Sequence, residues 1–144
     1  MTSPLNSVCE LTVAHDMNEP CPCGSGERYG ACCEPLHHGE VQARTAEELM
    51  RSRYSAFARG DADYLFRTWH PRTRPSDVTV DPGSTWIGLD VIDTVAGGPQ
   101  DDWGEVEFTA RYESAGRADT LRERSRFARR AGRWFYLDAV TAEA

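Results

Sequence analysis

The stretch Cys21-Pro22-Cys23-Gly24-Ser25-Gly26-Glu27-Arg28-Tyr29-Gly30-Ala31-Cys32-Cys33 holds four of the five cysteines of this chain. They form a C-x-C pair and, eight residues later, a directly adjacent C-C pair. Structural zinc prefers four soft ligands in a tetrahedron, and a loop loosened by glycines can fold both pairs around one ion. The spacing therefore predicts a metal centre with the ligands Cys21, Cys23, Cys32 and Cys33.

Four thiolates leave no open coordination position, so we expect a structural centre that carries out no hydrolysis. A module of this size cannot build a hydrophobic core, and metal binding has to supply its folding free energy, on the order of 10 kcal/mol. Ferrous iron also suits four thiolates, and the sequence does not separate Fe²⁺ from Zn²⁺.

A redox dithiol or a pair of disulfides is the alternative interpretation of these cysteines. Adjacent cysteines bridge poorly to each other, and no redox-active helix start lies nearby, so metal binding is favoured. The fifth cysteine, Cys9, is expected to be a free thiol in a polar tail.

Composition restricts the class of protein. The formal net charge of −7 does not favour a general nucleic-acid binder, and we expect no DNA partner. No apolar run is long enough to span a bilayer, and residues 1–16 lack the basic start and apolar block of a secretory signal. We therefore expect a cytoplasmic protein without a membrane partner, in a compartment that keeps thiols reduced.

The chain divides into three segments. Residues 1–19 are polar and lack periodicity, which predicts a flexible tail, with Met17 as an alternative start of the natural protein. Residues 20–40 form the metal module, which is rich in Gly, Pro and Cys, and residues 41–144 form one further domain.

This domain begins with two predicted helices. Thr45 heads a T-x-x-E capping box, and apolar residues follow it at helical spacing up to Gly60, which ends the helix. Asp61 caps a second helix, which we expect to run through Trp69 and to stop at the His-Pro pair that follows.

The remainder of the domain predicts four strands, at residues 86–95, 105–112, 120–130 and 133–140. In the second of them, strict alternation assigns the inner face to Val106, Phe108, Ala110 and Tyr112. Helices followed by an antiparallel meander indicate an α+β fold.

The cysteine stretch resembles the SEC-C motif, a zinc-binding module of several small bacterial proteins. Its two ligand pairs, the Gly-Ser-Gly at 24–26 and the aromatic Tyr29 agree with that motif. The resemblance implies zinc as the metal, and SEC-C modules elsewhere dock onto ribosomes or partner proteins. Where the motif usually carries lysines, residues 27–31 read ERYGA. Residues 1–40 contain six acidic residues and one arginine, so ribosomal RNA phosphates would repel the module.

Further segments resemble the YchJ-like family, namely residues 50–57 (MRSRYSAF), 69–71 (WHP), 125–127 (SRF) and 132–138 (GRWFYLD). That family joins a SEC-C motif to a domain resembling nuclear transport factor 2. The resemblance covers residues 20–140 and implies a cone of helices packed on a curved antiparallel sheet, in agreement with the predicted element order.

Cones of this class often enclose an apolar cavity, so polar residues aimed inward are candidates for function. Glu123 shares a strand face with apolar residues, Arg53 lies on the apolar side of the first helix, and His70 and Asp138 flank predicted element ends. These four residues are predicted to line a pocket that binds a small molecule or supplies an acid and a base. The alternative is a structural salt bridge that orients the helix against the sheet.

A second candidate site is the arginine-rich strand at residues 120–130. Alternation places Arg122, Arg124 and Arg126 on its outer face, where they would bind an acidic protein or ribosomal RNA. The alternative is a solvated face whose charges discourage edge pairing.

The leading function hypothesis is an adaptor whose zinc module presents a rigid loop to a macromolecular partner, such as a ribosome or a translocation or chaperone factor. The second hypothesis is a small-molecule-binding or enzymatic cone domain, and the third is that the module only staples the fold together. No phosphate-binding loop, Ser-His-Asp order or H-E-x-x-H motif is present, so no catalytic residue is assigned.

Overall fold

The computed structural model describes residues 18–140 of the chain. Most of the predicted tail, including Cys9, lies outside the described residues, as do residues 141–144. The described helices and strands are η1 (Tyr29–Ala31), α2 (Glu34–His37), α3 (Ala46–Arg59), α4 (Ala62–Arg67), β1 (Ser84–Ala96), β2 (Trp103–Ser114), β3 (Arg117–Arg130) and β4 (Arg133–Ala139).

Capping residues define both ends of α3. The Thr45 hydroxyl accepts a hydrogen bond from the Glu48 backbone N–H at 3.0 Å, and the Glu48 carboxylate accepts one from the Arg44 N–H at 2.7 Å. Gly60 follows the helix with a φ of +76°, a left-handed conformation that glycine adopts without strain. The helix predicted between Thr45 and Gly60 is confirmed.

The second helix, α4, begins after its N-cap Asp61 as predicted, but it ends at Arg67 and does not run through Trp69. The chain leaves the helix early because it pairs with β4. The His70 N–H donates to the Tyr136 carbonyl at 2.7 Å, and Trp69 forms an isolated bridge with the same residue.

Four antiparallel strands form one sheet in the order β1-β2-β3-β4. Two-residue turns, Ala115-Gly116 and Ala131-Gly132, connect the last three strands and have positive φ at both positions, which suits the right-handed twist of a hairpin. The four predicted strands are confirmed, and β1, β2 and β3 extend beyond their predicted ends.

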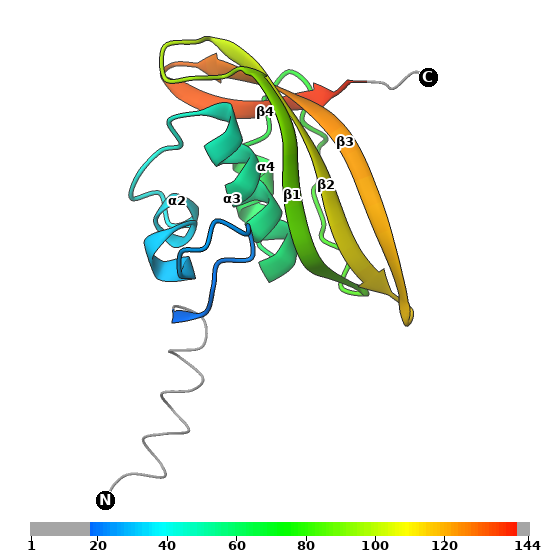
Figure 1. Cartoon of the computed structure of the whole chain (residues 1–144). Helices are drawn as coiled ribbons and strands as arrows, with labels where there is room; N and C mark the ends of the chain where they lie inside the picture. The colour runs from blue at the N-terminus through cyan, green and yellow to red at the C-terminus, as the bar shows by residue number, and fades with distance from the viewer. Residues whose placement is uncertain (1–17, 141–144) are drawn as a thin grey trace, which may run out of the picture.

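The sheet curves around the helices, which lie against its concave face (Figure 1). The side chains of Val106, Phe108 and Ala110 are buried there, and Tyr112 packs on Trp86 with the ring centroids 5.1 Å apart. The predicted α+β fold with helices on a curved antiparallel sheet is confirmed. The metal module packs beside α3 (Figure 1), and its Gly24 approaches the Leu89 carbonyl of β1. No helix within residues 18–140 combines the length and the apolar character needed to cross a membrane.

Candidate metal centre and cavity

The fold brings the four thiols of the metal module together. Their Sγ atoms all lie within 4.8 Å of one another. Cys23 and Cys32 are 3.6 Å apart, and Cys32 and Cys33 are 3.9 Å apart. A tetrahedron with Zn–S bonds of about 2.3 Å has edges of about 3.8 Å, so the cluster has the size that a zinc ion requires.

Two glycines and a short helix position these ligands. Gly24 and Gly26 have φ values of +80° and +92°, which turn the chain back on itself after the first cysteine pair. The Cys21 N–H can then donate to the Glu27 carbonyl at 2.8 Å. The second pair follows η1 directly, and Cys33 is the N-cap of α2, so this pair lies beside the first.

The sulfur cluster is largely shielded from solvent. Cys21, Cys23 and Cys33 are buried, Cys32 is half-buried, and all four are free thiols. Hydrogen bonding from the Cys21 and Cys33 thiols lowers the pKa of Cys23, whereas burial raises the pKa of Cys32 to about 12. Because a metal ion binds thiolates, its affinity for this cluster must rise with pH.

Two hydroxyl groups lie next to the sulfurs. The Ser25 hydroxyl is 3.1 Å from Cys32 Sγ, and the Ser55 hydroxyl of α3 is 3.7 Å from Cys21 Sγ. Contacts of this kind orient the ligands of a metal centre and tune its affinity.

A buried imidazole joins the metal module to α3. Nε2 of His37 lies 2.8 Å from the Ser52 carbonyl oxygen, and Nδ1 lies 2.6 Å from the Tyr29 hydroxyl. Burial lowers the pKa of His37, so the ring is neutral at physiological pH. No motif in the sequence points to His37, and its only signal is a position one helical turn after Cys33.

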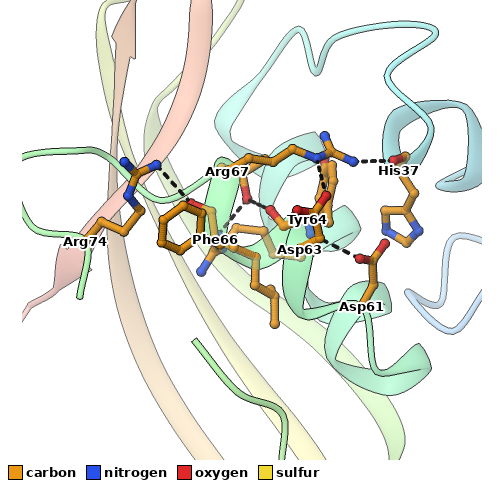
Figure 2. A network of polar contacts seen from close by, with 10 residues as sticks. His37, Asp61, Asp63, Tyr64, Phe66, Arg67 and Arg74 are labelled. Carbon is orange, nitrogen blue, oxygen red and sulfur yellow. Dashed lines mark hydrogen bonds and ion pairs between the residues drawn. The ribbon is translucent and has the colours of Figure 1, made fainter. Parts of the chain in front are cut away.

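Arginines of both helices hold the module in place. Arg67 of α4 donates to the His37 carbonyl and forms an ion pair with Asp63 at 3.1 Å (Figure 2). Its guanidinium also lies over the Tyr64 ring, 4.8 Å from the centroid. Arg51 of α3 donates to a backbone carbonyl of the first cysteine pair at 2.7 Å. The module is therefore docked on the helix layer of the cone.

A cavity of about 220 Å³ lies between α3 and the sheet. Arg53 of α3 and Glu123 of β3 both line it, so the fold brings together two of the four predicted pocket residues. Aromatic and aliphatic side chains form most of the wall, which consists of Met50, Arg53, Tyr54, Phe57, Trp69, Trp86, Phe108, Ala110, Leu121, Glu123, Ser125, Phe127 and Tyr136.

Arg53 is only 6% exposed. It donates from Nη1 to the Leu65 carbonyl at 2.9 Å and to the Thr68 hydroxyl at 2.7 Å. Its guanidinium carbon lies 4.6 Å from the centroid of the Tyr136 ring. Within residues 18–140 neither Arg53 nor Glu123 forms an ion pair, so the salt bridge considered from the sequence is not present.

The other two predicted pocket residues lie outside this cavity. The His70 ring packs against Phe135, with centroids 5.9 Å apart, and its Nδ1 accepts the Arg72 N–H at 3.0 Å. Asp138 accepts two hydrogen bonds of 2.7 Å from Arg126, which lower its pKa. Both residues stand near element ends, where sequence periodicity does not show which way a side chain points.

The three arginines predicted to form a basic surface each bind carboxylates. Arg122 pairs with Glu107 at 2.7 Å, Arg124 contacts three carboxylates at 2.7 to 3.0 Å, and Arg126 binds the end of β4. The antiparallel register sets Glu105 opposite Arg126 and Glu107 opposite Arg124. The predicted partner surface therefore belongs to a charge-balanced network that spans all four strands, and its role in binding a partner stays a prediction.

Two family models match the chain. The SEC-C motif matches residues 17–35, which include all four clustered cysteines, and the model described as "YchJ, middle NTF2-like domain" matches residues 45–139. A UPF0225 protein of Streptomyces coelicolor is 53% identical over 119 residues, which are 83% of this chain and 93% of that protein. A UPF0225 protein of Deinococcus radiodurans is 49% identical over 123 residues, 85% of this chain and 89% of that protein.

Two solved structures share the fold. The solution structure of a SEC-C motif containing protein from Rhodopseudomonas palustris has a TM-score of 0.74 and 34% identity, and the match covers 85% of this chain and 98% of that one. The crystal structure of a SEC-C motif containing protein from Psychrobacter arcticus has a TM-score of 0.68 and 26% identity, and covers 86% of this chain and 84% of that one.

Proposed function

The chain belongs to the UPF0225 family and combines a SEC-C motif with a YchJ-like NTF2-like domain, and we propose that it is a small-molecule-binding protein stabilised by structural zinc. The observation that carries the proposal is the cavity with Arg53 and Glu123 on its walls. A cone that served only as a platform for the zinc module would not need a hollow core containing two charged groups.

The chemistry of the thiol set supports zinc. Four sulfurs within 4.8 Å of one another suit Zn²⁺, and four thiolate ligands would leave no open position for catalysis. Ferrous iron remains the alternative for the same ligands. Bound metal would hold the two cysteine pairs together. The ordered module would then stabilise the cone through its contacts with α3.

Helix α3 is the element through which the module braces the cavity. Ser52 and Ser55 contact the metal module, whereas Arg53, Tyr54 and Phe57 line the cavity on the other face. A disordered module would therefore release one wall of the cavity.

Binding of neutral apolar probes tests the proposal. Indole and phenethyl alcohol should shift the amide NMR signals of residues around the cavity in zinc-loaded protein. Leu121→Trp, at a cavity-lining position that is 39% exposed, should fill the space and abolish these shifts. Ile92→Trp is the matched control, since Ile92 is an exposed strand residue outside the cavity. If neither these probes nor their charged analogues bind the folded, zinc-loaded protein, the proposal is rejected.

The adaptor hypothesis is the second candidate, and one observation favours it. Residues 24–27 are all exposed on a loop whose ends are fixed by the cysteine pairs, so they form a rigid feature that faces solvent. The loop carries Glu27, which suits a basic protein surface better than ribosomal RNA. Co-sedimentation with ribosomes or a translocation factor should be lost in Glu27→Arg and retained in Arg124→Glu. Absence of salt-dependent association with either partner would remove this candidate.

A further inference from the structure

From the two unpaired charges in the cavity, we infer that its ligand is a small zwitterion with an apolar side group, of the amino acid type. The carboxylate of the ligand binds at Arg53 and its ammonium group binds at Glu123. This inference rests on the proposed binding function and specifies the chemical class of the ligand.

Arg53 supplies the anion-binding end. Its guanidinium is buried, yet its hydrogen-bond acceptors are a carbonyl and a hydroxyl, and it also lies over the rings of Trp69 and Tyr136. Glu123 interacts with Arg53 electrostatically but forms no ion pair with it. Burial lowers the pKa of Arg53 to about 10, which still leaves it charged at neutral pH. A buried cation without an anionic partner is unfavourable, and a carboxylate can satisfy it with two parallel hydrogen bonds.

A second donor lies at the same end of the cavity. The indole Nε1 of Trp69 is buried and has no hydrogen-bond partner within residues 18–140. The guanidinium carbon of Arg53 is 5.4 Å from the centroid of this ring. An oxygen-rich ligand group beside Arg53 would therefore also have an unused N–H donor in its surroundings.

Glu123 supplies the cation-binding end from the sheet. Its carboxylate accepts a hydrogen bond from the Ser125 hydroxyl at 2.7 Å and has no cationic partner among the described residues. Glu123 lines the cavity together with Tyr136, and burial and then the neighbouring Glu123 carboxylate raise the pKa of Tyr136 to about 12. Free carboxylate oxygens accept hydrogen bonds from an ammonium group.

Charge balance selects a zwitterion over a simple acid or amine. Arg53 and Glu123 together are neutral, so an anion would leave one net negative charge in a poorly solvated space, and a cation would leave one net positive charge. A zwitterion satisfies both groups and keeps the cavity neutral. The volume of about 220 Å³ lies below the range typical of drug-sized ligands, and the aromatic wall suits one compact apolar side group.

Two matched series of probes test the inference by calorimetry on the full, zinc-loaded chain. One series is leucine, isocaproate, isoamylamine and isoamyl alcohol, and the other is phenylalanine, hydrocinnamate, phenethylamine and phenethyl alcohol. Each series keeps the apolar group and removes the ammonium group, the carboxylate or both. At least one amino acid should bind at least about tenfold more tightly than its own acid and amine.

Variants assign the two ends. Glu123→Gln keeps the side-chain shape and should weaken amino acid binding about tenfold without weakening binding of the acids. Arg53→Met should weaken binding of amino acids and acids but not of amines. If this variant fails to fold, Glu123→Gln still tests whether the ligand's ammonium group binds in the cavity. Asp138→Asn, at a carboxylate outside the cavity, should change nothing.

The outcomes separate the inference from the function on which it rests. Binding of the alcohols with no preference for the amino acids would leave a small-molecule-binding protein and overturn the zwitterion. Equal or tighter binding of the acid or of the amine in both series would overturn it as well. Failure of every probe, the alcohols included, would overturn both.

Discussion

The imidazole Nε2 of His37 lies 2.8 Å from the carbonyl oxygen of Ser52, in the middle of α3. A carbonyl oxygen only accepts hydrogen bonds, so Nε2 carries the proton and Nδ1 is the acceptor for the Tyr29 hydroxyl, 2.6 Å away. The neutral ring thus links the metal module to the helix that forms one wall of the cavity.

This link predicts a pH dependence of stability. Burial holds the pKa of His37 below its usual value, so on acidification the unfolded chain binds a proton near pH 6.5 while the folded chain resists it. The free energy of unfolding should therefore fall as the pH drops below about 6.5. Urea unfolding between neutral and mildly acidic pH, with zinc present, measures the slope.

His37→Gln keeps a donor for Ser52 but cannot titrate. This variant should be less stable than the wild type at neutral pH, and its free energy of unfolding should fall less steeply on acidification. The exposed neighbour His38 provides the control, since His38→Gln should retain the wild-type slope. Equal slopes in all three proteins would show that His37 does not contribute to the pH dependence.

Removal of one metal ligand should unfold the module. Cys33→Ser deletes a buried thiol from a centre whose metal supplies folding free energy on the order of 10 kcal/mol, so bound zinc and the thermal midpoint should both fall. Elemental analysis and circular dichroism provide the readouts. Cys9→Ser is the matched control and should retain one zinc per chain. A zinc-free wild-type protein with an unchanged midpoint would contradict the bracing role.

The hydroxyl beside the metal ligands should set metal affinity. Ser25 lies 3.1 Å from Cys32 Sγ, and loss of such an outer contact typically weakens metal binding by about 10- to 100-fold. Ser25→Ala should therefore release zinc to a competing chelator at a lower chelator concentration than the wild type does. Ser76→Ala, at an exposed position outside the module, should behave as the wild type. Identical competition curves for both variants would exclude the role of Ser25.

Gly97 and Gly104 bring two backbone segments close together near the start of α3, and a larger residue does not fit there. A Cβ on Gly104 would lie 2.5 Å from the Cα of Gly97, and Gly97 accepts the Ala46 N–H at 2.9 Å. Gly104→Ala must displace backbone, so it should lower the free energy of unfolding by about 1–3 kcal/mol. In Gly83→Ala the nearest atom is a flexible carboxylate oxygen, and denaturant titration should find a much smaller change. Comparable losses in the two variants would argue against this steric explanation.

Features set by neighbours in sequence were predictable. The C-x-C and C-C pairs span thirteen residues from end to end, so local turns are enough to place them side by side. Thr45, Gly60 and Asp61 act within one helical turn of the groups that they cap. The end of α4 was missed because Trp69 and His70 bond to Tyr136, far along the chain, and that pairing overrides helical propensity.

The sequence by itself determined the cluster of cysteine pairs, the two helices and the four-stranded meander, because each depends on spacing or alternation within a few residues. Only the tertiary structure decided that Arg53 and Glu123 share a cavity, that His70 and Asp138 do not, and that the outer arginines are neutralised. It also revealed His37 as a buried contact between module and cone. The physical reason is that these relations join distant residues, and they depend on strand register and on which face of α3 meets the sheet.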